Sequence, residues 1–225
     1  MRDEFHDGIQ AQVDHLADVA DICDRMLERA LHALVTPGAH GAADVVALDN
    51  EVDRSYQEIE RAVLELIALQ APVGRDLRLL TAILHVNIHV ERLGDYAAHI
   101  AKMAGVVSEL IDHPDLARAL VDMGTAAGHI ARTSLRSFAD RDPALARRLP
   151  ILDDRVDELN LDIFRRLVQL AAVDERRLEW ATHMIVVARS LERYGDHAVD
   201  IGEQTLFAVT GETVELSSND PHALA

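Results

Sequence analysis

The sequence predicts an all-α fold made of two tandem, pseudo-symmetric three-helix bundles, and three observations support this prediction. The chain has 225 residues, of which 49% are hydrophobic but only 4% aromatic, with 6 Pro and 11 Gly. This composition is typical of helices rich in Ala and Leu. Apolar residues recur at alternating spacings of three and four, as on one face of a helix. Finally, a short acidic phrase in the first half returns in the second.

Three helices are predicted in the first half. In the first helix, apolar residues follow the helical spacing over residues 9–34, and Pro37-Gly38 ends the run. The second covers residues 45–66 and ends before Ala71-Pro72, because proline disfavours helical backbone at the residue before it. The third has its apolar face over residues 86–104.

The second half repeats this pattern after a break at His113-Pro114. A fourth helix is predicted over residues 116–130, a fifth over 152–170 and a sixth over 187–201, each from its apolar spacing. The segment containing Asp142-Pro143 and Leu149-Pro150 is predicted to connect the fourth helix to the fifth.

Internal similarity sets the predicted domain boundaries. The stretch L-D-N-E-V-D at 48–53 matches L-D-D-R-V-D at 152–157, and E-R-L-G-D at 91–95 matches E-R-Y-G-D at 192–196. Residues 1–110 and 115–211 are therefore predicted to be two related three-helix repeats. Residues 212–225 have no apolar stripe, and we expect them to form a flexible tail.

Charge and targeting signals limit the functional classes. The formal net charge of −17 would repel nucleic acid and an anionic membrane surface, so we expect no nucleic-acid binding and membrane association only through partner proteins. The single cysteine, Cys23, excludes an intrachain disulfide. Because there is no signal peptide and no apolar run long enough to span a membrane, we expect a cytoplasmic protein.

Acidic pairs four residues apart are the main candidates for a functional site. A single pair means little, since about six or seven such pairs are expected by chance from 39 acidic residues in this chain. Here, however, each half has one pair on its second helix and one on its third. The pairs are Asp49 with Asp53, Glu91 with Asp95, Asp153 with Asp157, and Glu192 with Asp196. Each pair occupies one helix face, so two packed helices would bring four carboxylates together.

Four neighbouring carboxylates require a compensating charge. A bound cation is one solution, and all-oxygen ligation suits Mg²⁺, Ca²⁺, Mn²⁺ or iron. Pairing with Arg92 and Arg193 is the alternative. Gly94 and Gly195 occupy the same place in both halves although glycine destabilises a helix interior by about 1 kcal/mol. We interpret them as clearance for the neighbouring helix.

Histidines near these acids are interpreted less specifically. On the third helix of each half, the ladder of acids continues to His99 in the first half and to Asp200 in the second, and either residue can add a ligand. His85 and His89 are spaced like a metal-binding pair but fall on a different helix face from the acids. We interpret them as surface histidines or as contacts between helices.

Several motifs resemble the PhoU family of phosphate-uptake regulators. They are M-R-D-E-F-H at the start, A-L-Q-A-P-V-G-R-D-L-R at 68–78, V-E-R-L-G-D-Y-A-A-H-I-A at 90–101 and L-E-R-Y-G-D-H-A-V-D-I-G at 191–202. This resemblance implies two three-helix bundles that hold metal ions such as Fe, Mn or Mg on acidic motifs. Carried onto this sequence, the implied ligands are Asp49, Asp53, Glu91, Asp95, Asp153, Asp157, Glu192, Asp196 and Asp200.

The resemblance also implies partners and a regulatory role. PhoU-like proteins link the cytoplasmic ATPase of a phosphate ABC transporter to a phosphate-sensing histidine kinase, and they restrain the phosphate-starvation response of the Pho regulon. We therefore expect a non-enzymatic negative regulator that contacts both partners and forms a homodimer.

Two other functions remain open from the sequence alone. A metal-free helical scaffold, with arginines neutralising the acids, is the first. A carboxylate-bridged metalloenzyme is the second, but bundles of that kind use Glu-x-x-His, and no Glu in this chain has His three residues later. No arrangement of Ser, His and Asp and no glycine-rich phosphate loop indicates catalysis.

Overall fold

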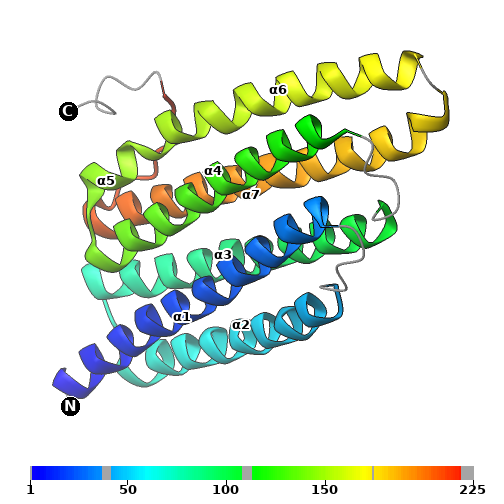
Figure 1. The fold of residues 1–225 in the computed structure, drawn as a ribbon. Helices are drawn as coiled ribbons and strands as arrows, with labels where there is room; N and C mark the ends of the chain where they lie inside the picture. Colours follow the sequence, from blue (N-terminus) through cyan, green and yellow to red (C-terminus); the bar gives the residue numbers. More distant parts are fainter. Residues whose placement is uncertain (1, 37–41, 108–112, 174, 219–225) are drawn as a thin grey trace.

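The computed structural model describes residues 2–36, 42–107, 113–173 and 175–218. Six long helices make up most of it, as predicted (Figure 1). They are α1 (Arg2–Val35), α2 (Ala42–Gln70), α3 (Arg75–Val107), α4 (Pro114–Asp140), α6 (Leu149–Val173) and α7 (Leu178–Thr210). A short helix, α5 (Pro143–Arg147), and a single 3₁₀ turn, η1 (Glu175–Arg177), complete the described secondary structure.

These helices form two three-helix bundles that pack against each other. Helices α1, α2 and α3 contact one another in the first, and α4, α6 and α7 do so in the second. Between the bundles, α3 packs along α7 and α1 packs against α4, while α2 and α6 lie on opposite outer sides (Figure 1). Buried apolar residues from both bundles belong to one continuous core, so the two repeats share a hydrophobic interior.

Local sequence explains most helix ends. Helix α2 ends at Gln70, in agreement with the predicted effect of Pro72, and Ala71 leaves the helix with a positive φ of 43°. Gly211 ends α7 with φ of 83°, a left-handed conformation that glycine adopts without steric cost. Pro37 and Gly38, which were predicted to end the first helix, lie outside the described residues.

The segment predicted only as a connection contains a helix, α5. Asp142 caps it by accepting hydrogen bonds from the backbone N–H groups of Ala144 and Leu145 at 2.9 and 3.0 Å. Pro143 occupies the first helical turn, where its missing N–H costs nothing. The cap and the proline thus favour a helix even over five residues.

Residues 212–218, which were expected to belong to a flexible tail, contact α5 and α7. The side chain of Leu216 is only 8% exposed and packs with Ala146 and Leu206. Its backbone N–H donates a hydrogen bond to Glu203 Oε1 at 2.8 Å. Apolar packing of Leu216 and Val214 and the hydrogen bond to Glu203 therefore help to hold this segment against α7, and residues 219–225 of the predicted tail lie outside the described chain. Within the described helices, none combines the length and apolar character needed to cross a membrane.

Candidate metal centre

The first group of acids lies between α2 and α3. Asp49 and Asp53 come from α2, and Glu91 and Asp95 from α3. Burial raises the pKa of Asp49, and the charges of Asp53 and Asp95 raise it further, while Lys102 lowers it. Burial and the neighbouring Asp95 raise the pKa of Glu91, to which Asp53 and Asp49 also contribute. The acids of the two helices therefore interact electrostatically, and we call these four residues the first acidic cluster.

The second acidic cluster lies between α6 and α7 and is more strongly perturbed. It consists of Asp153, Asp157, Glu192 and Asp196. Burial, followed by the charges of Asp157, Asp196 and Glu192, raises the pKa of Asp153 to about 7. Burial is also the main reason why the pKa values of the other three members are raised. These carboxylates are held close enough together to disfavour their simultaneous ionisation.

Two buried carboxylate oxygens of this cluster have no hydrogen-bond partner among the described residues. They are Asp153 Oδ1 and Glu192 Oε2. The nearest cationic group to Glu192 Oε2 among its ion pairs is Arg193 Nε, at 3.9 Å, which is beyond hydrogen-bond distance. A buried, unpaired carboxylate oxygen is costly, and a hard cation would satisfy it. The donor set thus fits the metal ions that the sequence implied.

Among the described residues, arginines form ion pairs with the acids on only one of the two helices of each cluster. Arg92 donates to Asp95 Oδ2 at 2.7 Å and lies 3.5 Å from Glu91, while Arg193 lies 3.4 Å from Asp196. Arg189, which sequence reasoning missed, also pairs with Glu192. Its position three residues before Glu192 was the available signal.

Acids on the partner helices lack such pairs. In the described part of the chain, no arginine or lysine ion pair reaches the acids of α2 or α6, namely Asp49, Asp53, Asp153 and Asp157. Arginine pairing therefore accounts for at most half of the charge in each cluster.

The two glycines provide the clearance predicted for them. A Cβ atom on Gly94 would lie 3.1 Å from Val52 Cγ1 of α2, closer than most carbon contacts. A Cβ atom on Gly195 would lie 2.5 Å from Asp153 Oδ1, which is a steric clash. In the second cluster, the missing side chain therefore makes room for the carboxylate itself.

We expect a Gly195→Ala substitution to displace the Asp153 carboxylate toward solvent and to lower its pKa from about 7 toward the ordinary value. Stability should change little, because alanine gains about 1 kcal/mol in helix propensity, which offsets the local rearrangement. Carboxyl-carbon NMR titration would measure this pKa. Gly94→Ala is the matched control and should leave the Asp153 titration unchanged; an unaltered midpoint in Gly195→Ala would contradict the proposed contact.

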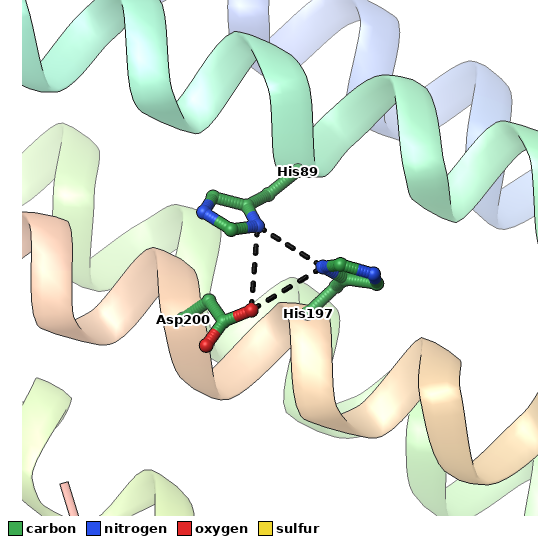
Figure 2. Close-up of side chains that lie close together, drawn as sticks. All are labelled: His89, His197 and Asp200. Atoms are coloured by element: carbon green, nitrogen blue, oxygen red, sulfur yellow. Dashed lines mark hydrogen bonds and ion pairs between the residues drawn. The ribbon is translucent and has the colours of Figure 1, made fainter. Parts of the chain in front are cut away.

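Asp200 and His99 lie at the contact between the bundles. Asp200 Oδ2 is 3.4 Å from His89 Nδ1 and 3.3 Å from His197 Nδ1 (Figure 2). His99 Nδ1 lies 3.3 Å from Ser190 Oγ on α7. Burial lowers the pKa of His89, although Asp200 opposes this effect.

His85 and His89 lie at contacts between helices, and His89 also belongs to a cluster that was not predicted. Such a contact was one of the two alternatives left open for both histidines: His89 contacts His197 of α7, and His85 Nδ1 lies 3.0 Å from Gln204 Oε1 of α7. The cluster that His89 forms with His197 and Asp200 was not predicted, because His197 did not stand out in the sequence. Among the described residues, only this group has three ligand atoms within 4.8 Å of one another. An ion bound by several acids of one acidic cluster would therefore require side-chain rotation.

An acidic groove of about 830 Å³ adjoins the second cluster. The segment at residues 213–218 forms one wall, so the groove could not be predicted while this segment was taken to be free. Its carboxylate lining comprises Asp153, Asp154, Asp157, Asp196, Asp200, Glu203 and Glu215. The groove therefore concentrates negative charge on one side of the second bundle.

Fold and site together define a class of all-α proteins in which a three-helix unit is duplicated and each copy has acids on its second and third helices. The PhoU domain model matches residues 16–104 and 120–205, and so includes both acidic clusters. The chain belongs to the PhoU family.

Individual relatives and solved structures agree with this assignment. The phosphate-specific transport system accessory protein PhoU homolog of Deinococcus radiodurans is 36% identical over 94% of this chain and 99% of its own length. That of Zymomonas mobilis subsp. mobilis is 33% identical over 93% of this chain and 87% of its own. The crystal structure of PhoU from Pseudomonas aeruginosa is similar with a TM-score of 0.87 and 27% identity, covering 92% of this chain and all of that one.

Proposed function

We propose that this protein is a metal-binding accessory and regulatory protein of phosphate uptake. Its PhoU relatives, named as accessory proteins of a phosphate-specific transport system, support the phosphate role. The unpaired buried oxygens of Asp153 and Glu192 are the observation that carries the metal-binding part. Both PhoU-domain matches contain a complete acidic cluster, so the proposal applies to each repeat.

In this proposal, each acidic cluster holds iron, Mn²⁺ or Mg²⁺. Asp49, Asp53, Glu91 and Asp95 would form the first site, and Asp153, Asp157, Glu192 and Asp196 the second. The ion would offset part of the negative charge of the carboxylates and place a local positive charge at the surface of a protein that is otherwise strongly acidic. Asp200 is better placed for a different role, because its Oδ2 atom lies beside two histidines.

The proposed partners are the cytoplasmic ATPase of the phosphate transporter and a phosphate-sensing histidine kinase. Such contacts would place the protein in the cytoplasm and would let it restrain the Pho regulon when phosphate is abundant. Metal on the clusters would give a partner's acidic side chains, or phosphate itself, a cationic surface to bind. We further propose that the protein acts as a homodimer, which light scattering of the purified protein would test.

Purified protein is expected to contain metal that depends on the clusters. Combined substitution of Glu91, Asp95, Glu192 and Asp196 by alanine removes half of the carboxylates of each cluster and should reduce bound iron, manganese and magnesium at least tenfold. Elemental analysis of both proteins, purified in parallel, gives the comparison. Equal and negligible metal in both would contradict metal binding while leaving the phosphate role open.

Deletion of the gene is expected to activate phosphate-starvation reporters even in high phosphate. Reporters that stay silent, together with normal phosphate uptake, would contradict the regulatory role. Complementation with the four-alanine variant separates the two parts of the proposal, because full repression by this variant would support a regulator that does not need metal on the acidic clusters. That outcome favours the scaffold alternative, for which the ion pairs of Arg92, Arg189 and Arg193 are the supporting observation.

A further inference from the structure

The contact between α3 and α7 has two ends that correspond by the internal repeat. His85, His89 and His99 of α3 contact Gln204, Asp200 and Ser190 of α7, so the helices run antiparallel. Equivalent residues of the two repeats are 101 positions apart, as Glu91 and Glu192 show. His89 therefore corresponds to Ser190, and Asp200 to His99. The contact between His89 and Asp200 is thus the counterpart of the contact between Ser190 and His99.

Only one of these two ends has the composition of a transition-metal site. It combines His89 and Asp200 with His197, whose counterpart in the first repeat is Tyr96. The other end offers His99 and Ser190, with no second imidazole at the matching position. The end with His99 and Ser190 therefore serves as an internal control for the cluster of His89, His197 and Asp200.

The three facing atoms form a nearly equilateral triangle. His89 Nδ1 and His197 Nδ1 are 3.1 Å apart, and Asp200 Oδ2 lies 3.4 and 3.3 Å from them (Figure 2). In a tetrahedral site with ligands at about 2.0–2.1 Å, neighbouring ligand atoms are about 3.3–3.4 Å apart. The triangle therefore already has the dimensions of three corners of such a site.

Protons or a cation can occupy this triangle. A neutral imidazole has one protonated and one unprotonated nitrogen. If both Nδ1 atoms carry protons, each N–H can donate to Asp200 Oδ2; if either nitrogen is unprotonated, its lone pair faces the Asp200 carboxylate. A cation coordinated by all three atoms needs both Nδ1 lone pairs to face it, and it offsets their repulsion with the carboxylate.

We propose that His89, His197 and Asp200 bind a divalent transition-metal ion, best represented by Zn²⁺, at the contact between the two repeats. Two imidazoles and one carboxylate suit this class of ion, in contrast to the all-oxygen acidic clusters. The ligand side chains are 19%, 22% and 39% exposed, so an ion can enter from solvent and water can complete the coordination. Because the ligands come from α3 and α7, the ion cross-links the two repeats.

This proposal does not rest on the proposed regulatory function, and Co²⁺ provides a selective probe. Four-coordinate Co²⁺ absorbs visible light strongly, whereas six-coordinate Co²⁺ on carboxylates and water absorbs weakly. Full-length protein freed of metal with a chelator is titrated with Co²⁺ and then with Zn²⁺. We expect one equivalent of strongly absorbing Co²⁺, which Zn²⁺ displaces, and a higher thermal unfolding temperature with Zn²⁺.

Matched variants assign the signal to these residues. His89→Ser should lose the Co²⁺ absorption and weaken Zn²⁺ binding at least tenfold, whereas His99→Ser, at the other end of the same contact, should retain both. The four-alanine variant of the acidic clusters should also retain the signal, so failure here is distinguishable from failure of the proposed function. If His89→Ser is not folded by circular dichroism, Asp200→Asn, which preserves shape, replaces it.

Two results would overturn the proposal. The first is the absence of strong Co²⁺ absorption in the wild-type protein. The second is a signal of equal strength in the wild type and in a folded His89→Ser or Asp200→Asn variant. Either result would leave the cluster as a contact between helices.

Discussion

Metal-free protein is expected to lose about 1–2 kcal/mol of stability through Asp153 as the pH rises from about 4 to 8. The pKa of this carboxyl group is about 7 in the folded protein against 3.8 when unperturbed. Between these values the folded state binds one proton more than the unfolded state, so stability falls as the pH rises through this window. Asp153 keeps partial contact with water, and this contact reduces the change in stability.

Asp153→Asn tests this expectation directly. The variant should be more stable than the wild type at pH 8, and the difference should vanish below about pH 3, where the acid is protonated in both states. Urea unfolding across the pH range, with a chelator present, gives the measurement. Asp49→Asn, in the less strongly perturbed first cluster, is the matched control and should show a smaller effect of the same sign. A pH-independent difference for Asp153→Asn would contradict the argument.

Truncating the core where the two repeats meet should have the largest effect on stability. Leu93 of α3 and Tyr194 of α7 occupy equivalent positions, and each side chain is 1% exposed. Leu93→Ala is expected to cost about 2–5 kcal/mol and Tyr194→Ala about 3–5 kcal/mol, because each leaves a cavity in close-packed surroundings. Urea unfolding followed by circular dichroism measures both losses.

A surface substitution provides the control for these variants. Leu161 of α6 is 56% exposed, and Leu161→Ala should change stability by no more than about 0.5 kcal/mol. Because the two repeats share one core, all variants should unfold in a single transition. Two separated transitions, or a loss at Leu93 as small as that at Leu161, would show that the repeats are stabilised independently.

The helical architecture was largely predictable because apolar spacing reports the buried face of each helix directly. Val52 and Ile163, for example, lie on predicted apolar faces and are fully buried. Short elements were harder to predict. Helix α5 is too short to show a period, and its cap and proline resemble those of a turn. Leu216 and Val214 are two apolar residues in a short polar segment, too few to show a spacing pattern that signals burial.

For the candidate site, the sequence could predict interactions within a repeat but not those between repeats. Duplication marks Asp153 and Gly195 as a recurring pattern, and the structure brings them into contact. The proximity of His89 to Asp200 depends on how α3 and α7 align, and neither repeat contains that information alone. His197 is further obscured because its counterpart is a tyrosine, so comparison of the two halves gave it no weight.

The antiparallel contact of α3 with α7 has the organisation of a two-fold symmetric dimer interface enclosed in one polypeptide. In a dimer of identical single repeats, every substitution would appear at both ends of the interface. Covalent fusion removes that constraint, because the two ends are encoded separately and can diverge independently. The pair His99 and Ser190 at one end and the group of His89, His197 and Asp200 at the other differ in this way, so two equivalent ends of one contact carry different side-chain chemistry.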